Sequence, residues 1–178
     1  MRSVHTAILE AILGYRPAPK SLLDIGCGDG VFTRTIAATL PQTAITAVDV
    51  KQSKRFVGAK NITFKTGSAE ALPVDSDAYD LVTASLTLHH WTNQPQAITE
   101  VFRVLKPGGL FIIGDPLLEN WLINRFWGWL VQTLDGGRFA SAQTLQTWAQ
   151  DAGLDQVEIN LIPRTMKSLY LVTARKPA

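Results

Sequence analysis

The first fifty residues carry apolar positions at two different spacings. In segment 3–13 they recur at intervals of three and four residues, as expected of a helix with one buried face. Segments 21–25 and 45–50 are short apolar runs, and each predicts a buried strand. Segment 31–40 lies between them and is expected to form a helix. A strand, a helix and a second strand in this order form the repeating unit of α/β proteins.

The remainder of the chain continues this alternation. More strands and helices are expected, the strands at 62–65, 79–86 and 110–114 and the helices at 96–105 and 141–152. The basic segment 51–60 is expected to be a loop or a helix of one or two turns. The final two strands, 157–162 and 169–174, have only a short connection and should form an antiparallel hairpin. We therefore predict a single α/β domain over residues 1–178. Its sheet is doubly wound, seven-stranded and mostly parallel, the last strand is antiparallel, and helices lie between the first six strands.

Composition narrows the class of protein but does not identify its partner. Of the 178 residues, 46% are hydrophobic and 18% are charged, as in globular proteins. The net charge of +2 is too small to indicate a nucleic-acid or membrane surface by itself. The single cysteine, Cys27, excludes an internal disulfide, and we interpret it as a small filler and not as a nucleophile. Residues 1–14 lack the long apolar core of a signal peptide, so we expect a cytoplasmic protein.

The turn after the first strand carries the most informative chemistry. Positions 24–30 read D-x-G-x-G-x-G, and their glycines lack a Cβ, so a ligand can approach the backbone closely. The helix that follows directs its free N–H groups and positive dipole end to the same place. A dinucleotide fingerprint would need its third glycine at Val31. The carboxylates of Asp24 and Asp29 repel phosphate but attract an ammonium or a sulfonium, which favours a cationic nucleoside over NAD.

An acidic residue ends the second predicted strand. Asp49 lies 49 − 30 = 19 positions after Gly30, the separation expected of a carboxylate that reaches ribose hydroxyls in such folds. A carboxylate can accept hydrogen bonds from two hydroxyls at once. The alternative, a solvated residue at a strand end, does not explain this register with the glycine turn.

Three segments together resemble the class I S-adenosylmethionine-dependent methyltransferases. Residues 24–30 are similar to motif I of that family, residues 67–73 (GSAEALP) to its G-D-A-x-x-L-P segment, and residues 105–109 (LKPGG) to its turn into the fifth strand. The resemblance extends over about the whole chain and is nearest to the small-molecule branch called methyltransferase type 11. It implies methyl transfer from S-adenosyl-L-methionine to a small-molecule acceptor, with S-adenosyl-L-homocysteine as the product.

The resemblance also implies roles within the cofactor site. The glycines of the turn would frame the methionine tail, with Asp24 and Asp29 near its ammonium, and Asp49 would hold the ribose. Ser68 stands where the family has an aspartate beside adenine, and a hydroxyl without charge implies weaker discrimination of that base. The cofactor-binding residues implied in this way are Asp24, Gly26, Cys27, Gly28, Asp29, Gly30, Asp49, Val50, Ser68, Ala69, Glu70 and Ser85.

The class of molecule that accepts the methyl group is narrowed mainly by excluding alternatives. Family members that methylate base amino groups carry (D/N)-P-P-(Y/F) after the fourth strand, whereas residues 85–88 read SLTL, so nucleic acid is disfavoured as a partner. His89 and His90 follow, and one of them can serve as the base for a hydroxyl acceptor. The alternative is that one packs under the next helix and the other faces solvent. The side chains of these neighbours are expected to diverge, and no metal site is predicted.

Residues 116–140 form a long insertion that is rich in tryptophan. The segment follows the fifth strand and so lies at the carboxyl ends of the strands, where ligands of open α/β sheets bind. Its apolar residues are too many for one helical stripe. We predict a lid or cap over a hydrophobic acceptor, such as a quinone-like ring or a lipid-like chain. The same residues can instead pack as core, form a homodimer interface or make peripheral contact with a membrane.

Two other functions stay open at this point. A Rossmann-type NAD-dependent oxidoreductase would share the fold, although Val31 and Asp24 disfavour it. A methyltransferase-like module that binds the cofactor without activity of its own would fit the short 51–60 segment and the serine at position 68. Comparing the binding of S-adenosylmethionine with that of NAD tests the oxidoreductase alternative. Turnover of small methyl acceptors tests the alternative of a module without activity.

Overall fold

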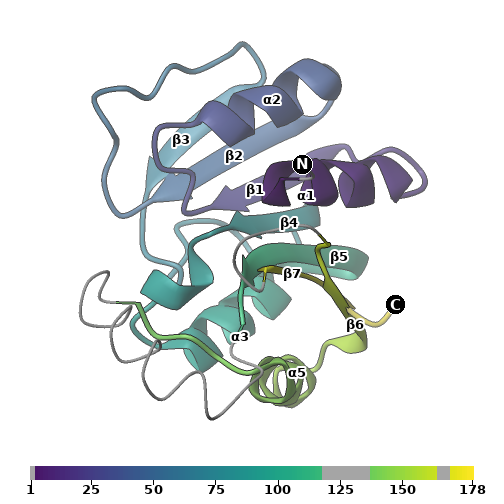
Figure 1. The fold of residues 1–178 in the computed structure, drawn as a ribbon. Coiled ribbons are helices and arrows are strands. Elements are labelled where there is room, and N and C mark those ends of the chain that lie inside the picture. The colour runs from purple at the N-terminus through teal and green to yellow at the C-terminus, as the bar shows by residue number, and fades with distance from the viewer. Residues whose placement is uncertain (1–2, 118–136, 164–168) are drawn as a thin grey trace.

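The computed structural model describes residues 3–117, 137–163 and 169–178. They form a seven-stranded sheet in the order β3-β2-β1-β4-β5-β7-β6, with helices on both faces (Figure 1). Neighbouring strands are parallel except at β7, which is antiparallel to both β5 and β6. This confirms the predicted doubly wound sheet with a reversed last strand. The strands are β1 (Ser21–Ile25), β2 (Ala44–Asp49), β3 (Ile62–Thr66), β4 (Tyr79–Ser85), β5 (Leu105–Pro116), β6 (Asp155–Leu161) and β7 (Leu169–Arg175).

Side chains on the two faces of the central strands pack against different helices, which explains why these strands are apolar on both faces. Leu22 belongs to the buried cluster that includes α1 and α2, whereas Leu23 belongs to the cluster that includes α3 and α5. The hydroxyls of Ser3 and Ser141 cap α1 and α5 by accepting from first-turn N–H groups. The helices are α1 (Val4–Gly14), α2 (Val31–Thr39), the short 3-10 helix η1 (Leu88–His90), α3 (Gln94–Val104) and α5 (Ala142–Asp151).

Two connections differ from the prediction of a helix between each of the first six strands. Within the described part of the chain, residues 50–61 and 67–78 contain no helix. The segment 51–60 is therefore the loop alternative, with turns at 54–55 and 60–61. Its Phe56 ring packs against Phe64 of β3, with the ring centroids 5.0 Å apart. One such contact is too little to hold an amphipathic helix against the sheet.

Strand β5 begins earlier than predicted. The sequence predicts a turn at 105–109 and a strand at 110–114, but the strand runs from Leu105. Leu105 pairs with Tyr79 of β4 before the register shifts, so the glycines of the expected turn lie inside the strand as an irregularity. Local sequence indicates such a turn but does not show that the residue before it pairs with a neighbouring strand.

Both edges of the sheet carry polar or irregular strands. At one edge, the register of β6 against β7 shifts between Asp155 and Glu158, where Gln156 adopts a φ of 49°. Most side chains of β6 are exposed. At the other edge, Lys65 lies within β3 and its Nζ donates to the carbonyl oxygen of Pro73 at 3.1 Å.

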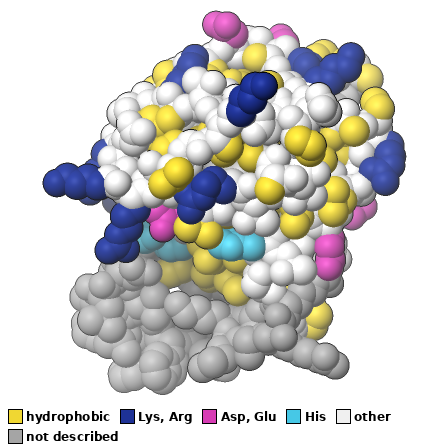
Figure 2. All heavy atoms as spheres, turned by 90° about the horizontal axis from the view of Figure 1, so that it is seen from above, with side chains coloured by type: hydrophobic (Ala, Val, Ile, Leu, Met, Phe, Trp, Pro, Cys, Tyr) yellow, Lys and Arg dark blue, Asp and Glu magenta, His cyan; other side chains and the backbone are white. Residues whose placement is uncertain are grey.

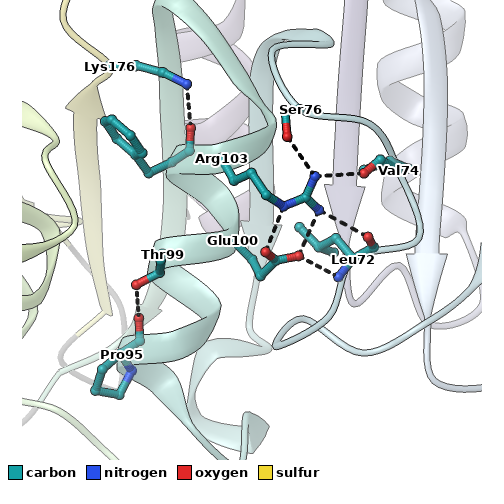
Figure 3. A network of polar contacts seen from close by, with 9 residues as sticks. Leu72, Val74, Ser76, Pro95, Thr99, Glu100, Arg103 and Lys176 are labelled. Carbon is teal, nitrogen blue, oxygen red and sulfur yellow. Dashed lines mark hydrogen bonds and ion pairs between the residues drawn. The ribbon is translucent and has the colours of Figure 1, made fainter.

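A polar network on α3 fixes the loop after β3 (Figure 3). The guanidinium of Arg103 donates to both carboxylate oxygens of Glu100, at 2.7 and 2.8 Å. It also donates to the carbonyl oxygens of Leu72 and Val74, at 3.1 and 2.9 Å. Glu100 in turn accepts from the N–H of Leu72 at 2.8 Å. Because residues 67–70 precede this loop directly, the network on α3 helps to position them.

Replacing Arg103 with alanine is expected to lower the free energy of unfolding by about 1–2 kcal/mol. The change removes the guanidinium donors of two backbone carbonyls and of Glu100, which keeps the N–H of Leu72, although partial exposure of the side chains limits the loss. Urea unfolding followed by circular dichroism measures it. Arg55→Ala is the control, because Arg55 lies in the exposed 51–60 loop. Equal unfolding midpoints for the two variants would contradict the assigned role of the network.

Candidate functional site

The glycine turn joins β1 to α2 at the point where the sheet order reverses, since β2 and β4 lie on opposite sides of β1. Ligands of open α/β sheets bind in the crevice at such a point. Gly26 and Gly28 adopt φ values of 71° and 55°, in the region that favours glycine. A Cβ at Gly26 would overlap the side chain of Thr87, whereas a Cβ at Gly28 would meet nothing within 4 Å. The turn is therefore tightly packed at its first glycine and open at its second.

Asp49 holds the turn from the end of β2. Its Oδ2 accepts from the N–H of Gly28 at 2.9 Å, and its Oδ1 has only a long contact of 3.4 Å from the N–H of Lys51. The backbone strengthens this link, because the N–H groups of Gly26 and Cys27 donate to the carbonyl of Val48 at 2.8 and 3.2 Å. One carboxylate oxygen of Asp49 thus stabilises the turn, while the other keeps most of its capacity to accept from a ligand.

A first cavity of about 300 Å³ opens beside this link. It lies at the carboxyl ends of β1 and β2 and is closed on another side by the chain after β4. Trp91 and Thr92, which the sequence analysis does not assign, belong to its wall. The cavity brings together these residues of the predicted site: Gly26, Asp49, Val50, Ser68, Ala69, Glu70 and His90.

Two further cavities surround the turn. One of about 200 Å³ shares Gly26 with the first cavity, and one of about 470 Å³ is lined by the turn and the loop 51–54. Gly30 lines none of these three cavities and is instead the N-cap residue of α2. The 200 Å³ cavity contains the other predicted residues, namely Asp24, Cys27, Gly28, Asp29 and Ser85, together with His5, Val31 and Phe32.

Asp24 is buried, with 2% of its surface exposed. Its carboxylate accepts from the hydroxyls of Thr33 on α2 and Thr83 on β4, at 2.5 and 3.1 Å. Burial raises the pKa of Asp24 to about 6, against the lowering effect of these two hydrogen bonds. The residue therefore joins β1, β4 and α2 beneath the turn. Its predicted proximity to the cofactor ammonium stays a prediction.

Cys27 lies inside the turn and is half-buried. Burial, together with the negative charges of Asp24 and Asp49, raises the pKa of the Cys27 thiol to about 12. A thiol in this state is a poor nucleophile at neutral pH. The environment thus agrees with the interpretation of Cys27 as a filler.

Glu70 connects two walls of the first cavity. Its Oε1 accepts from the N–H groups of Thr92 and Asn93, at 2.7 and 3.1 Å, and its other oxygen contacts the Ser68 hydroxyl. Burial raises the pKa of Glu70, but these hydrogen bonds outweigh it and the net pKa is lowered. Ser68 is therefore already engaged with Glu70, and its predicted contact with adenine remains untested. Sequence spacing gives no signal for the contact between the 68–70 turn and residues 92–93.

The two histidines of η1 have different surroundings. His89 is buried, and its Nδ1 lies 2.7 Å from Oδ1 of Asp115 at the end of β5. Its ring also stacks on Phe139, with centroids 5.1 Å apart. His90 is exposed and lines the first cavity. The expectation that the two side chains diverge is wrong, because the 3-10 turn brings their ring centroids to 4.0 Å.

Asp115 is a site residue that the sequence analysis does not identify. Its Oδ2 accepts from the N–H of Leu88 at 3.0 Å, so both oxygens hold η1. Burial raises the pKa of Asp115, although His89 opposes this effect. The only signal for Asp115 in the sequence is that a carboxylate stands near the end of β5, the strand that pairs with β4. The end of the tryptophan-rich segment completes the cluster, since the N–H of Arg138 donates to the carbonyl of His89 at 2.6 Å.

Several expectations concern features outside this site. Residues 118–136, which hold most of the predicted lid, lie outside the described residues, so that prediction is untested. No group of three or more metal-ligating side chains occurs among the residues described. No helix within the described ranges is long and apolar enough to cross a membrane. Figure 2 shows Lys and Arg side chains spread over one face, some of them grouped at its left side, and no continuous stripe of them across that face.

Comparison with known proteins identifies a matching family and similar curated proteins. A family model described as a methyltransferase domain matches residues 1–159. The chain is 32% identical over 120 residues to the ubiquinone/menaquinone biosynthesis C-methyltransferase UbiE of Methylobacterium nodulans, which covers 62% of this chain and 48% of that protein. It is also 32% identical over 114 residues to the malonyl-[acyl-carrier protein] O-methyltransferase of Methylococcus capsulatus, with 61% and 42% covered. The chain spans about half the length of the curated relatives that it matches.

A solved structure shares the architecture. The YcgJ protein of Bacillus subtilis superposes with a TM-score of 0.78 at 21% identity, and 98% of both chains is covered. At this identity the likeness concerns the fold alone. It agrees with the strand order and with the reversed β7 described above.

Proposed function

The chain belongs to the methyltransferase domain family, and from this we propose that it binds S-adenosyl-L-methionine at the glycine turn and methylates a small apolar or aromatic molecule. The observation that carries the proposal is the hydrogen bond from the N–H of Gly28 to the carboxylate of Asp49. It places a carboxylate with one largely available oxygen beside an open glycine backbone at the carboxyl ends of the strands. This donor and acceptor set matches a nucleoside that has ribose hydroxyls and a cationic tail.

The residues around the turn fit such a cofactor in two further respects. The Ser85 hydroxyl is buried and has no hydrogen-bond partner among the described residues, although buried polar groups normally have one. It lies in the wall of the 200 Å³ cavity, where a bound ligand can supply that partner. The open space at Gly28 gives the cofactor room for close contact with the backbone. Asp49 and Val50 would hold the ribose side, and Asp29 with the glycines would hold the amino-acid end.

The protein's own contribution to catalysis would be mainly orientation. When bound, S-adenosylmethionine supplies an activated methyl group and a neutral thioether leaving group. The chain must then hold the acceptor in line with the methyl group and exclude water, which positioning alone can largely provide. His90 lines the first cavity and is the candidate to take a proton from a hydroxyl acceptor, whereas His89 is held by Asp115.

The acceptor class is inferred from relatives and from composition. The relative from Methylobacterium nodulans is named for ubiquinone and menaquinone, and the one from Methylococcus capsulatus for a malonyl group on a carrier protein. A quinone-like ring and a lipid-like chain are apolar, as the tryptophan-rich segment 116–140 would require of its ligand, whereas a malonyl group ends in a carboxylate. We place the quinone-like ring first, because Phe139 near the end of this segment adds an aromatic ring beside His89.

Replacing Asp49 with alanine is expected to weaken binding of S-adenosylhomocysteine by about 1.5–3 kcal/mol, or about 10- to 100-fold. The change removes both the acceptor for the ribose and the hydrogen bond that holds Gly28. Isothermal titration with S-adenosylmethionine, S-adenosylhomocysteine and NAD measures it. Asp151→Ala on the exposed end of α5 is the matched control. Equal affinity of the Asp49 variant and the wild type would show that the ribose assignment is wrong, and binding of NAD alone would refute the proposed cofactor.

A further inference from the structure

The loop between β2 and β3 is basic and contains no acidic residue. From position 51 its sequence reads KQSKRFVGAK. Its cations are exposed and form no side-chain ion pair or hydrogen bond within the described part of the chain: Lys51, Lys54, Arg55 and Lys60. The other Lys and Arg side chains of that part, Lys20 excepted, each contact a carboxylate or a backbone carbonyl. Cations without a partner are therefore concentrated in this loop.

The middle of the loop is anchored to the glycine turn and to β3. Phe56 packs against Phe64 and also lies against Gly30, where an added Cβ would be 2.7 Å from the Phe56 ring. The Nη1 of Arg34 on α2 donates to the carbonyl of Val57 at 3.3 Å. The Val57 side chain itself is 61% exposed. The fold thus fixes the backbone of the loop and leaves its charged and apolar side chains at the surface.

Three of these cations lie beside the cavities of the candidate site. Lys51 and Lys54 line the 470 Å³ cavity together with the glycine turn, and Arg55 follows them directly. Val50, which precedes them, is 68% exposed and lines the 300 Å³ cavity. The loop lies at the left in Figure 1, and Figure 2 shows Lys and Arg side chains grouped on that side, near the histidines. We call the following residues the basic patch: Val50, Lys51, Lys54, Arg55 and Val57.

The basic patch combines positive charge with exposed apolar side chains, and this combination suits a bilayer that contains anionic lipids. The headgroup phosphates would accept from the cations, while Val50 and Val57 would enter the boundary between headgroups and acyl chains. Each Lys or Arg near such a surface strengthens binding about 5-fold. An acidic protein would match the charge equally well. Its interface would need a packed apolar core, however, and the patch offers only two valines for one.

We propose that the basic patch docks the protein on anionic lipid surfaces, with the candidate site opening toward the membrane. The inference rests on the proposed function for its purpose, because a quinone-like acceptor dissolves in lipid and would reach the site from there. It assigns the contact to the loop 51–60 and not to the segment 116–140. The small net charge of the chain does not oppose it, because the unpartnered cations are gathered at one place.

Co-sedimentation with lipid vesicles tests the docking without cofactor or acceptor. Vesicles of phosphatidylcholine alone are compared with vesicles in which about one third of the lipid is phosphatidylglycerol. The wild type should bind the anionic vesicles about 100-fold more tightly at about 0.1 M salt and lose most of this preference at about 1 M salt. The triple variant Lys51→Gln, Lys54→Gln, Arg55→Gln should lose the preference, again about 100-fold.

A pair of single variants provides the matched control. Lys54→Gln should weaken binding to the anionic vesicles about 5-fold. Lys20 is also exposed and without a side-chain partner among the described residues, but it precedes β1, at the opposite ends of the parallel strands. Lys20→Gln should therefore stay within about 2-fold of the wild type. Equal losses in these two variants, or equal binding of the wild type to neutral and anionic vesicles, would overturn the inference.

A soluble polyanion distinguishes a bilayer from an acidic protein. Poly-L-glutamate carries charge but has no apolar layer, so Val57→Ser should weaken binding to anionic vesicles about 5-fold and leave binding to poly-L-glutamate within about 2-fold. Tighter binding to poly-L-glutamate than to the vesicles, with Val57→Ser affecting neither, would overturn the lipid assignment in favour of an acidic protein. Titration of S-adenosylmethionine into the wild type stands apart from these measurements. Its failure would refute the proposed function, whereas loss of vesicle binding alone would refute only the docking.

Discussion

Replacing His89 with alanine is expected to lower the free energy of unfolding by about 3–5 kcal/mol at neutral pH. The buried carboxylate of Asp115 would lose its partner at 2.7 Å and keep only backbone N–H donors, those of Leu88 and Thr87. Loss of the stack on Phe139 adds to the cost. Since burial already raises the pKa of Asp115, the carboxyl can take up a proton in the variant. The deficit should therefore shrink as the pH is lowered.

His90→Ala is the matched control for this experiment. His90 is the sequence neighbour of His89 but is exposed, and its loss should change stability by no more than about 0.5 kcal/mol. Guanidinium unfolding at several pH values measures both variants. Similar losses in the two would mean that the contact with Asp115 contributes little to stability. If an acceptor is found, a changed pH profile in His90→Ala alone would support its role as the base.

Replacing Asp24 with asparagine is expected to change the free energy of unfolding more favourably at pH 7 than at pH 4, by about 2–3 kcal/mol. Burial raises the pKa of Asp24 from 3.8 to about 6. An acid with a higher pKa in the folded state favours folding when protonated, so the wild type loses this stability as pH rises from about 4 to 6. Two pKa units correspond to about 3 kcal/mol. Asparagine carries no charge at either pH and avoids the loss.

The difference between the two unfolding curves isolates this residue. Asp115 also has a raised pKa, while Glu70, Asp80 and Glu100 have lowered values, and all four are present in both proteins. Their effects therefore cancel in the comparison. Urea unfolding at pH 4, 5, 6 and 7 gives the curves. A constant difference across this range would mean that Asp24 is not titrating as a buried acid. An increase in stability coupled to weaker cofactor binding would indicate that the buried charge is retained for function.

The sequence predicts those parts of the fold in which local pattern and tertiary environment agree. Residues 21–25 are apolar on both faces because the strand is covered on both, and the structure has the same bounds for β1. The glycine turn is predictable for a related reason: its conformation depends on the residue types within it, and all three of its glycines have positive φ. The helix bounds are less certain, as α3 begins at Gln94 and not at 96.

The remaining features depend on contacts between distant segments. Asp115 meets His89 only because β4 and β5 are adjacent and their carboxyl ends coincide. Glu70 reaches Thr92 across the first cavity, and neither residue belongs to a pattern that spacing reveals. His5 in the first helix is interpretable only once Phe32 is known to lie beneath it. These contacts are set by strand order and helix packing, which a one-dimensional pattern does not contain.

The form of the sheet edges bears on how copies of the chain behave at high concentration. A flat edge strand with unpaired N–H and C=O groups is a template on which another molecule can add a strand. Strand β6 is interrupted near Gln156 and largely polar, and β3 at the opposite edge carries Lys65. Both features oppose continuation of the sheet from one molecule into the next. Self-association of the native protein would then have to proceed through side-chain surfaces, and these edges give it resistance to fibre-like assembly.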